Sequence, residues 1–365
     1  MNRTWTTLLT ASLMSLTIPS HAATLLVGSY TDGASQGIYR YQFDEQRGHI
    51  DPTPQQVVKS VSPSWLVLSA DRRLLFAVNE TPGGNASSFR VSAKGDIKPL
   101  NQVASQGDEP THASLSHDQR YLFVANYAVN PDPGGSLAVM PIARDGQLKP
   151  VVQQLRHRPS GVNRERQAGG HVHSLVSSPN GQYLYASDLG ADKVFIYRYD
   201  GASPDQPLSP ATPPSVALPP GSGPRHLLFD ATGQHAYLTL EMSGEVVMFN
   251  VSGADLRVGQ RLALTEASAS TAKAAGGLHL SADGHFLYVS NRGTANEIVV
   301  FAVEGDGQLT FVQRRAVEGD HPREFALDPS NRFLLVANQK SNQIVVMRRD
   351  AKTGKLGETV QVLAQ

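Results

Sequence analysis

One pattern of hydrophobic and polar residues recurs along most of the chain. Each copy has a short apolar strand, a tight polar turn and a second apolar strand with polar residues at its end, and the last residue comes 16 positions after the first. The copies are Ser64–Glu80, Thr111–Tyr127, His173–Leu189, Arg225–Glu241, Gly276–Arg292 and Arg323–Gln339. Asn180-Gly181 and Asp283-Gly284, in the middle of two copies, are strong signals for two-residue turns. The pattern therefore predicts a series of β-hairpins.

Two further strands are expected after each hairpin, usually separated by a polar turn with Gly, as in Glu297–Phe301 and Gly305–Leu309. A partial copy, Leu25–Tyr30, resembles Leu122–Tyr127 and raises the number of units to seven. Seven units after residue 22 give about 49 residues each, and four strands at such a period are typical of β-propellers. We therefore predict an all-β fold: a seven-bladed β-propeller with four-stranded antiparallel blades around a central channel, forming one domain over residues 23–365.

The closure of this ring is less regular. The first and last segments of a propeller normally share one blade, and the partial copy at Leu25–Tyr30 lacks an inner strand of its own. The chain ends at Val362–Gln365, which resembles an outer fourth strand instead of the missing inner one. The pattern therefore leaves open that one blade has only three strands.

The first 22 residues have the features of an export signal. One charge, Arg3, precedes an apolar run, Leu8–Ile18, that is too short to cross a bilayer at about 20 residues per span. Small residues, Ser20 and Ala22, occupy the −3 and −1 positions of a cleavage site. We predict a signal peptide over residues 1–22, cleaved after Ala22, and a periplasmic protein without a membrane span. A buried N-terminal helix is the alternative.

Composition narrows the chemistry. The chain carries 32 basic and 32 acidic residues, so no excess charge would attract nucleic acid or an anionic membrane. It has no cysteine, which excludes disulfides, thiolate metal sites and a cysteine nucleophile and suits an oxidising compartment. His171 and His173 lack an evident third metal ligand, and no calcium-loop spacing appears. We expect no metal, no other cofactor, a small-molecule ligand and a monomer.

A hairpin of constant length places its first and last residues opposite each other on one face of the propeller. Most of these positions carry unremarkable residues, but three consecutive units carry His173, Arg225, Glu241 and Arg292. Convergent charged groups at a channel mouth are a typical site for a small polar ligand. The alternatives are that Arg225 and Glu241 form only a structural ion pair, and that the histidines are structural. A recurring asparagine favours a turn or capping role, at Asn79, Asn126, Asn291 and Asn338.

These residues resemble those of the lactonase family of seven-bladed propellers, which includes a bacterial 6-phosphogluconolactonase and fungal-type carboxy-muconate lactonizing enzymes. The resemblance covers essentially the whole chain after residue 22. The chain departs from the family pattern in two features, the export signal and the missing inner strand. It implies that His173, Arg225, Glu241 and Arg292 are the catalytic residues. The matching phrases are His171-Val172-His173-Ser174, Gly223-Pro224-Arg225-His226, Glu241, Ser290-Asn291-Arg292 and Pro322-Arg323.

Roles follow from the chemistry of lactone hydrolysis, which passes through an oxyanion. Arg225 or Arg292 would stabilise that charge, a contribution of roughly 3 kcal/mol. His173 or Glu241 would activate water, with Glu241 kept ionised by Arg225 and therefore suited to act as base or anchor. The expected substrate-binding residues are Arg323, which would hold a carboxylate or phosphate, and His112, His171, His226 and Glu80.

Export favours an unphosphorylated sugar δ-lactone such as glucono-1,5-lactone over 6-phosphogluconolactone, because the phosphorylated compound arises in the cytoplasm. Two alternatives remain: a muconate-type lactonizing cycloisomerase and a propeller that binds without catalysis. We also expect Arg225→Ala to have a small effect on stability, on the view that the residue lies at a wet channel mouth.

Overall fold

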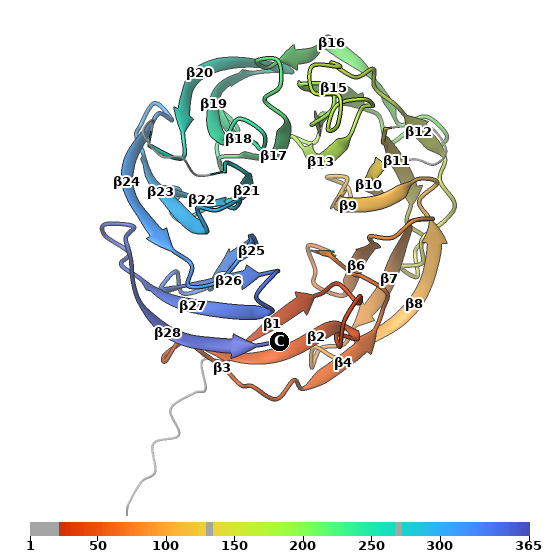
Figure 1. Cartoon of the computed structure of the whole chain (residues 1–365). Helices are drawn as coiled ribbons and strands as arrows, with labels where there is room; N and C mark the ends of the chain where they lie inside the picture. The colour runs from red at the N-terminus through yellow and green to blue at the C-terminus, as the bar shows by residue number, and fades with distance from the viewer. Residues whose placement is uncertain (1–21, 129–133, 267–271) are drawn as a thin grey trace, which may run out of the picture.

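The computed structural model describes residues 22–128, 134–266 and 272–365, and the predicted propeller is confirmed. Seven antiparallel sheets form a ring (Figure 1). Within these three ranges, no helix is long and apolar enough to cross a membrane. The predicted signal peptide, apart from Ala22, lies outside the described residues, so it stays a prediction.

The strands follow one another around the ring, each group of four forming one sheet. The first sheets contain β1 (Ala22–Gly28), β2 (Gly37–Asp44), β3 (His49–Ile50), β4 (Gln56–Lys59); β5 (Trp65–Leu68), β6 (Leu74–Asn79), β7 (Asn85–Val91), β8 (Ile97–Ala104); and β9 (Asp108–Leu115), β10 (Tyr121–Ala128), β11 (Ser136–Pro141), β12 (Gln153–Leu155). The next contain β13 (Val172–Ser177), β14 (Tyr183–Asp188), β15 (Lys193–Tyr199), β16 (Leu208–Ala217); and β17 (Pro224–Phe229), β18 (His235–Leu240), β19 (Glu245–Ser252), β20 (Asp255–Ala263). The last contain β21 (Ala275–Leu280), β22 (Phe286–Asn291), β23 (Glu297–Val303), β24 (Leu309–Ala316); and β25 (Pro322–Leu327), β26 (Phe333–Asn338), β27 (Gln343–Arg349), β28 (Leu356–Ala364).

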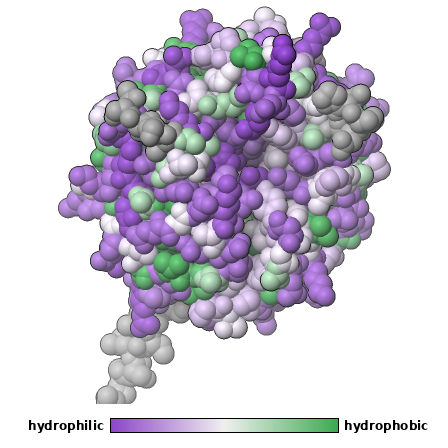
Figure 2. Space-filling model, in the orientation of Figure 1, coloured by the Kyte–Doolittle hydropathy of each residue, from purple (hydrophilic) through white to green (hydrophobic). Residues whose placement is uncertain are grey.

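The hydrophobic core lies between neighbouring sheets. One cluster, for example, joins Tyr185 and Val194 of one sheet to Leu238 and Val247 of the next. The second strand of a blade is covered on both faces, which explains its unbroken apolar run; every residue of β22 is buried. The face of the ring in Figure 2 is mainly hydrophilic, with hydrophobic residues in small separate groups.

Irregular pairing marks the start of five inner strands. In β13 the register steps from Val172 to Ser174, and in β25 it steps from Pro322 to Glu324. Bulges bend a strand and redirect side chains, and they are common beside functional sites. In three of these strands the extra residue is the first residue of the repeated phrase: Thr111, His173 and Arg323. In the other two strands the first two residues of the phrase are skipped: Arg225 with His226, and Gly276 with Gly277.

Three of the four recurring asparagines, Asn79, Asn126 and Asn338, have the capping role that their recurrence favours, whereas Asn291 donates to Glu297 Oε1. Asn79 Nδ2 donates to the Val61 carbonyl at 2.6 Å, and Asn126 Nδ2 donates to the Ser105 carbonyl at 3.1 Å. These bonds tie the strand end to the segment that enters the hairpin from the preceding blade.

The ring closes without a shared blade. β1 pairs with β2, and both β3 and β4 pair with the other edge of β2, so the first sheet is three strands wide and has no inner strand. β28 is the outer strand of the last sheet, as its sequence indicates. Side chains join the two ends: Phe43 meets Phe333 edge to face, and the Gln361 amide exchanges two hydrogen bonds with the backbone of Ile50.

Candidate active site

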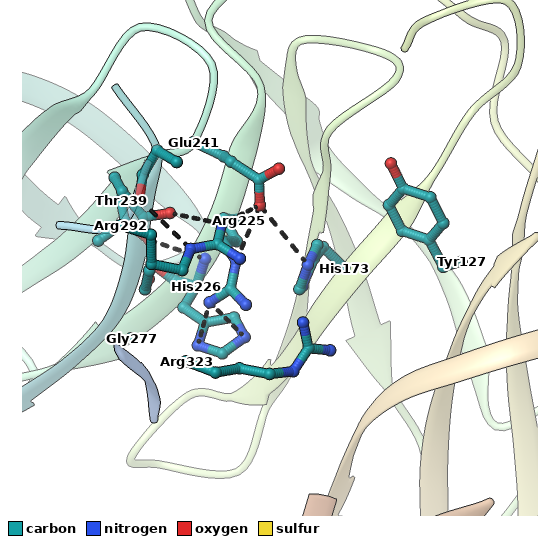
Figure 3. Close-up of polar contacts among 12 residues, drawn as sticks. Tyr127, His173, Arg225, His226, Thr239, Glu241, Gly277, Arg292 and Arg323 are labelled. Carbon is teal, nitrogen blue, oxygen red and sulfur yellow. Dashed lines mark hydrogen bonds and ion pairs between the residues drawn. The ribbon is translucent and has the colours of Figure 1, made fainter. Parts of the chain in front are cut away.

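The structure brings the residues predicted to be catalytic together around one carboxylate (Figure 3). His173 lies on β13 and Arg225 on β17, both at bulges, while Glu241 and Arg292 directly follow β18 and β22. Since all four are at equivalent ends of their hairpins, three consecutive blades deliver them to the same mouth of the ring.

Glu241 is the centre of the cluster. Its Oε2 accepts a hydrogen bond from Arg225 Nε at 3.0 Å and another from Arg292 Nη2 at 2.7 Å. His173 Nε2 lies 3.9 Å from the same oxygen. The predicted opposition of first and last hairpin residues is therefore confirmed for Arg225 and Glu241.

A third arginine, Arg166, was not found by sequence reasoning. Its Nη2 donates to Glu241 Oε1 at 2.7 Å and to the Tyr127 hydroxyl at 3.2 Å. It lies on the irregular segment between β12 and β13, outside the repeated phrase, where a concentration of basic residues is the only sequence signal. The neighbouring Gln167 is fully buried and anchors this segment to the Leu189 carbonyl and to Asp192.

The cluster is buried, which corrects the expectation of a wet mouth. Arg225 is 1 % exposed, and Glu241 and Arg292 are also buried. Removing one member of a buried charged cluster leaves its partners desolvated and incompletely paired. The premise of the expected small effect of Arg225→Ala on stability is therefore wrong, and the burial of Arg225 favours a larger loss. The hairpin pattern places the residue on the correct face but does not show that neighbouring blades cover it.

The arginines keep Glu241 ionised. Burial by itself would raise the pKa of Glu241, but the charges of Arg292 and Arg225 outweigh it and hold this pKa well below its usual value. Burial, followed by the nearby charge of Arg292, lowers the pKa of Arg225 to about 9. Both groups are thus charged at neutral pH, and a carboxylate with so low a pKa is a weak base.

Three buried histidines line the same space. The rings of His173 and His226 are 5.2 Å apart, and those of His226 and His112 are 5.5 Å apart, with Trp65 against His112. Burial lowers the pKa of His112 to about 3 and the pKa values of His173 and His226 well below 6.5, so all three are neutral at pH 7. Among the described residues, His173 Nδ1 has no hydrogen-bond partner.

The other predicted residues have different contacts. His171 is turned toward Tyr127: its Nδ1 lies 2.7 Å from the Tyr127 carbonyl oxygen and its ring stacks on the Tyr127 ring. His171 therefore supports the mouth and does not contact the Glu241 carboxylate. In the described part of the chain, no three His, Asp or Glu residues are placed to hold a metal ion.

Glu80 and Arg323 form a second cluster. Arg323 Nη2 lies 3.2 Å from both carboxylate oxygens of Glu80, and its guanidinium lies over the Tyr30 ring. Tyr30 and Ser64 also donate hydrogen bonds to Glu80 Oε2. Sequence reasoning selected Glu80 and Arg323 as separate substrate contacts, whereas the structure shows them paired with each other. Tyr30 was missed.

Comparison with known proteins identifies the family. The model of the lactonase family of seven-bladed β-propellers matches residues 24–365. The chain belongs to this family.

Relatives of this lactonase-family chain include two proteins named 6-phosphogluconolactonase. The one from Bacillus subtilis (strain 168) is 31% identical over 336 residues, which cover 90% of this chain and 92% of the relative. The one from Formosa agariphila is 33% identical over 350 residues, covering 93% and 96%. A solved structure, the periplasmic gluconolactonase of Pseudomonas aeruginosa, superposes with a TM-score of 0.91 at 50% identity, covering 94% of this chain and 96% of that one.

Proposed function

We propose that this member of the lactonase family hydrolyses an unphosphorylated sugar δ-lactone, such as glucono-1,5-lactone, to the aldonate at the Glu241 cluster. The observation that carries this proposal is a pair of arginines held on one buried carboxylate beside a neutral histidine. The names of the relatives, gluconolactonase and 6-phosphogluconolactonase, support lactone hydrolysis.

Arg225 and Arg292 are the proposed oxyanion-stabilising groups. A guanidinium has five N–H donors, and each of these arginines gives one of them to Glu241. Because Glu241 fixes both guanidinium groups before substrate arrives, little reorganisation is needed when the carbonyl oxygen gains charge. A preorganised donor of this kind contributes about 3–4 kcal/mol to a rate.

His173 is the better of the two proposed bases. Both oxygens of Glu241 are engaged by arginines, so it serves as an anchor, whereas His173 Nδ1 has no hydrogen-bond partner among the described residues. His173 is neutral and can take a proton from water as the water oxygen attacks the lactone carbonyl. The imidazolium then returns that proton to the ring oxygen as the ring C–O bond breaks, and Glu241 beside it favours the transient charge.

A periplasmic location is proposed on two grounds. Residues 1–22 have the features of an export signal, and the solved structure at 50% identity is of a periplasmic protein. Free aldonolactones are the products of sugar oxidation outside the inner membrane. The second candidate substrate is 6-phosphogluconolactone, favoured by the names of the two relatives at 31% and 33% identity.

The deciding experiment is a pH-stat assay of the purified protein on both lactones, corrected for spontaneous ring opening. We expect a higher kcat/KM for glucono-1,5-lactone. A higher value for the phosphorylated lactone would favour the second candidate. Turnover of neither lactone would contradict the proposed function, and conversion of a carboxy-muconate would then indicate a cycloisomerase.

A further inference from the structure

A cavity of about 580 Å³ lies at the seam where the ring closes. It is bordered by the end of β1, the following residues to Ser35, and the facing ends of β25, β26 and β27. The first sheet has no inner strand, so this is the part of the ring where the repeat leaves space unfilled. Its lining includes Tyr30, Asp32, Ser64, Arg323, Glu324, Gln339 and Lys340.

The cavity adjoins the proposed lactone site. Arg323 lines it and is also near enough to the Glu241 cluster for its charge to help lower the pKa values of His173 and Arg225, after the larger effect of burial. In Figure 3 the Arg323 side chain extends toward the His173 ring. Arg323 therefore belongs both to the lining of the cavity and to the charged surroundings of His173.

The charges of the lining do not suit a phosphate. Arg323 and Lys340 are matched by Glu324 and Asp32, and Arg323 is already bound to both oxygens of Glu80. Burial alone would raise the pKa of Glu324, but His279 and other partners outweigh it and lower this pKa. Glu324 is therefore a carboxylate at neutral pH, and it would repel a dianion entering the cavity.

The same groups suit hydroxyls. Serine hydroxyls, the Gln339 amide and the Arg323 guanidinium add donors and acceptors, and the Tyr30 ring adds an apolar face. Neutral polyhydroxylated rings are recognised by this combination. The volume is also greater than a single hexonolactone requires.

We propose that the seam cavity binds the second sugar ring of a disaccharide aldonolactone, whose lactone ring lies at the Glu241 cluster. This inference rests on the proposed function and names its substrate class: a neutral aldobionolactone. Since interactions with the remote ring are retained in the transition state, they raise kcat/KM for the larger substrate.

The test compares cellobiono-1,5-lactone with glucono-1,5-lactone, using the purified protein. We expect kcat/KM for the disaccharide lactone to be higher by about tenfold or more. Gln339→Trp and Ala34→Trp fill the cavity from opposite walls. Each should remove this advantage and change kcat/KM for glucono-1,5-lactone by less than about twofold. Thr294→Trp, an exposed position on the turn after β22 and outside the cavity lining, is the control and should change neither value.

Calorimetry with gluconate and cellobionate separates this inference from the proposed function. We expect tighter binding of cellobionate, lost in both cavity variants. If neither lactone is hydrolysed, the proposed function fails, while cavity-dependent binding of cellobionate would still support the second-ring site. Equal wild-type kcat/KM values for the two lactones, or equal losses for both in the cavity variants, would overturn the inference, as would equal binding of the two aldonates.

Discussion

Glu80 and Glu241 occupy the same position of the repeated phrase in two different blades, yet their surroundings differ. The hairpin residue opposite Glu241 is Arg225, whereas the residue opposite Glu80 is Ser64. Glu241 also gains Arg292 from the next blade and Arg166 from an irregular segment. Glu80 has one arginine, Arg323, which reaches it across the closure of the ring.

This difference in surroundings gives the two carboxylates different roles at the same mouth of the ring. Around Glu241, three guanidinium groups share one carboxylate, so positive charge is in excess and rigidly held, as stabilisation of an oxyanion requires. Around Glu80, one guanidinium meets one carboxylate beside an open cavity, so charge is balanced and polar contacts remain for a neutral ligand. The propeller repeat sets where each carboxylate lies, and the neighbouring side chains set what it can do.

The largest expected effect comes from removing the charge of Glu241. Glu241→Gln leaves Arg225 and Arg292 buried with like charge and no counterion, so the free energy of unfolding should fall by about 3–5 kcal/mol. Glu80→Gln should lower it by only about 1–2 kcal/mol, because a single charged hydrogen-bonding partner is affected. Urea denaturation of both variants measures the difference. Equal losses would show that the two carboxylates are not distinct in the way their contacts indicate.

Next is the effect on turnover of Arg225→Ala. Loss of one preorganised donor should lower kcat/KM for glucono-1,5-lactone by two to three orders of magnitude, about 3–4 kcal/mol. Arg323→Ala, which removes the arginine of the other carboxylate, should lower it by no more than about tenfold. Rates are taken per folded molecule, because the buried Arg225 also contributes to stability. Undiminished turnover in Arg225→Ala would exclude this arginine from the reaction.

A pH dependence of stability should follow from the buried histidines. His112 has a folded-state pKa of about 3, below its ordinary value of 6.5, so the unfolded chain binds a proton that the folded chain does not. Stability is therefore expected to fall as the pH drops below about 6.5, and to keep falling toward pH 3.

His112→Phe keeps a ring against Trp65 and removes the titrating group, so its melting temperature should depend less on pH between about 7 and 5 than that of the wild type. His285→Phe is the control, since the His285 side chain is 74% exposed, and it should follow the wild-type curve. If the melting temperatures of His112→Phe and the wild type changed equally with pH, His112 would not be the group that binds a proton only in the unfolded chain.

The sequence predicts the propeller well because a constant spacing of 16 residues directly encodes a hairpin. The same spacing predicts that Arg225 faces Glu241, and it places His173 and Arg292 at the same mouth. The pairing of Arg323 with Glu80 could not be predicted, because it depends on how the two ends of the ring meet.

Two further features of the site could not be predicted from the repeat. Arg166 comes from an irregular segment whose path depends on tertiary contacts, such as those of Gln167 with Leu189 and Asp192. Burial of Arg225 depends on neighbouring blades, and a pattern within one hairpin contains no information about them. The repeat therefore predicts at which mouth of the ring a hairpin-end residue lies. How deeply that residue is buried, and which irregular segments contact it, depends on the packing of neighbouring blades and can be seen only in the structure.

The smallest effect is expected for Arg166→Ala. The Arg166 side chain is 45% exposed, and Glu241 keeps Arg225 and Arg292 when it is removed. An ion pair with one exposed partner contributes about 1 kcal/mol or less, so kcat/KM should fall by no more than about tenfold and the melting temperature should change little. Because the contact is screened by salt, the loss should shrink as ionic strength rises. Arg166→Lys, which keeps the charge, should recover part of it. A loss as large as that of Arg225→Ala, unchanged by salt, would instead mean that Arg166 contacts the reacting lactone, and Glu241 would then hold three catalytic arginines instead of two.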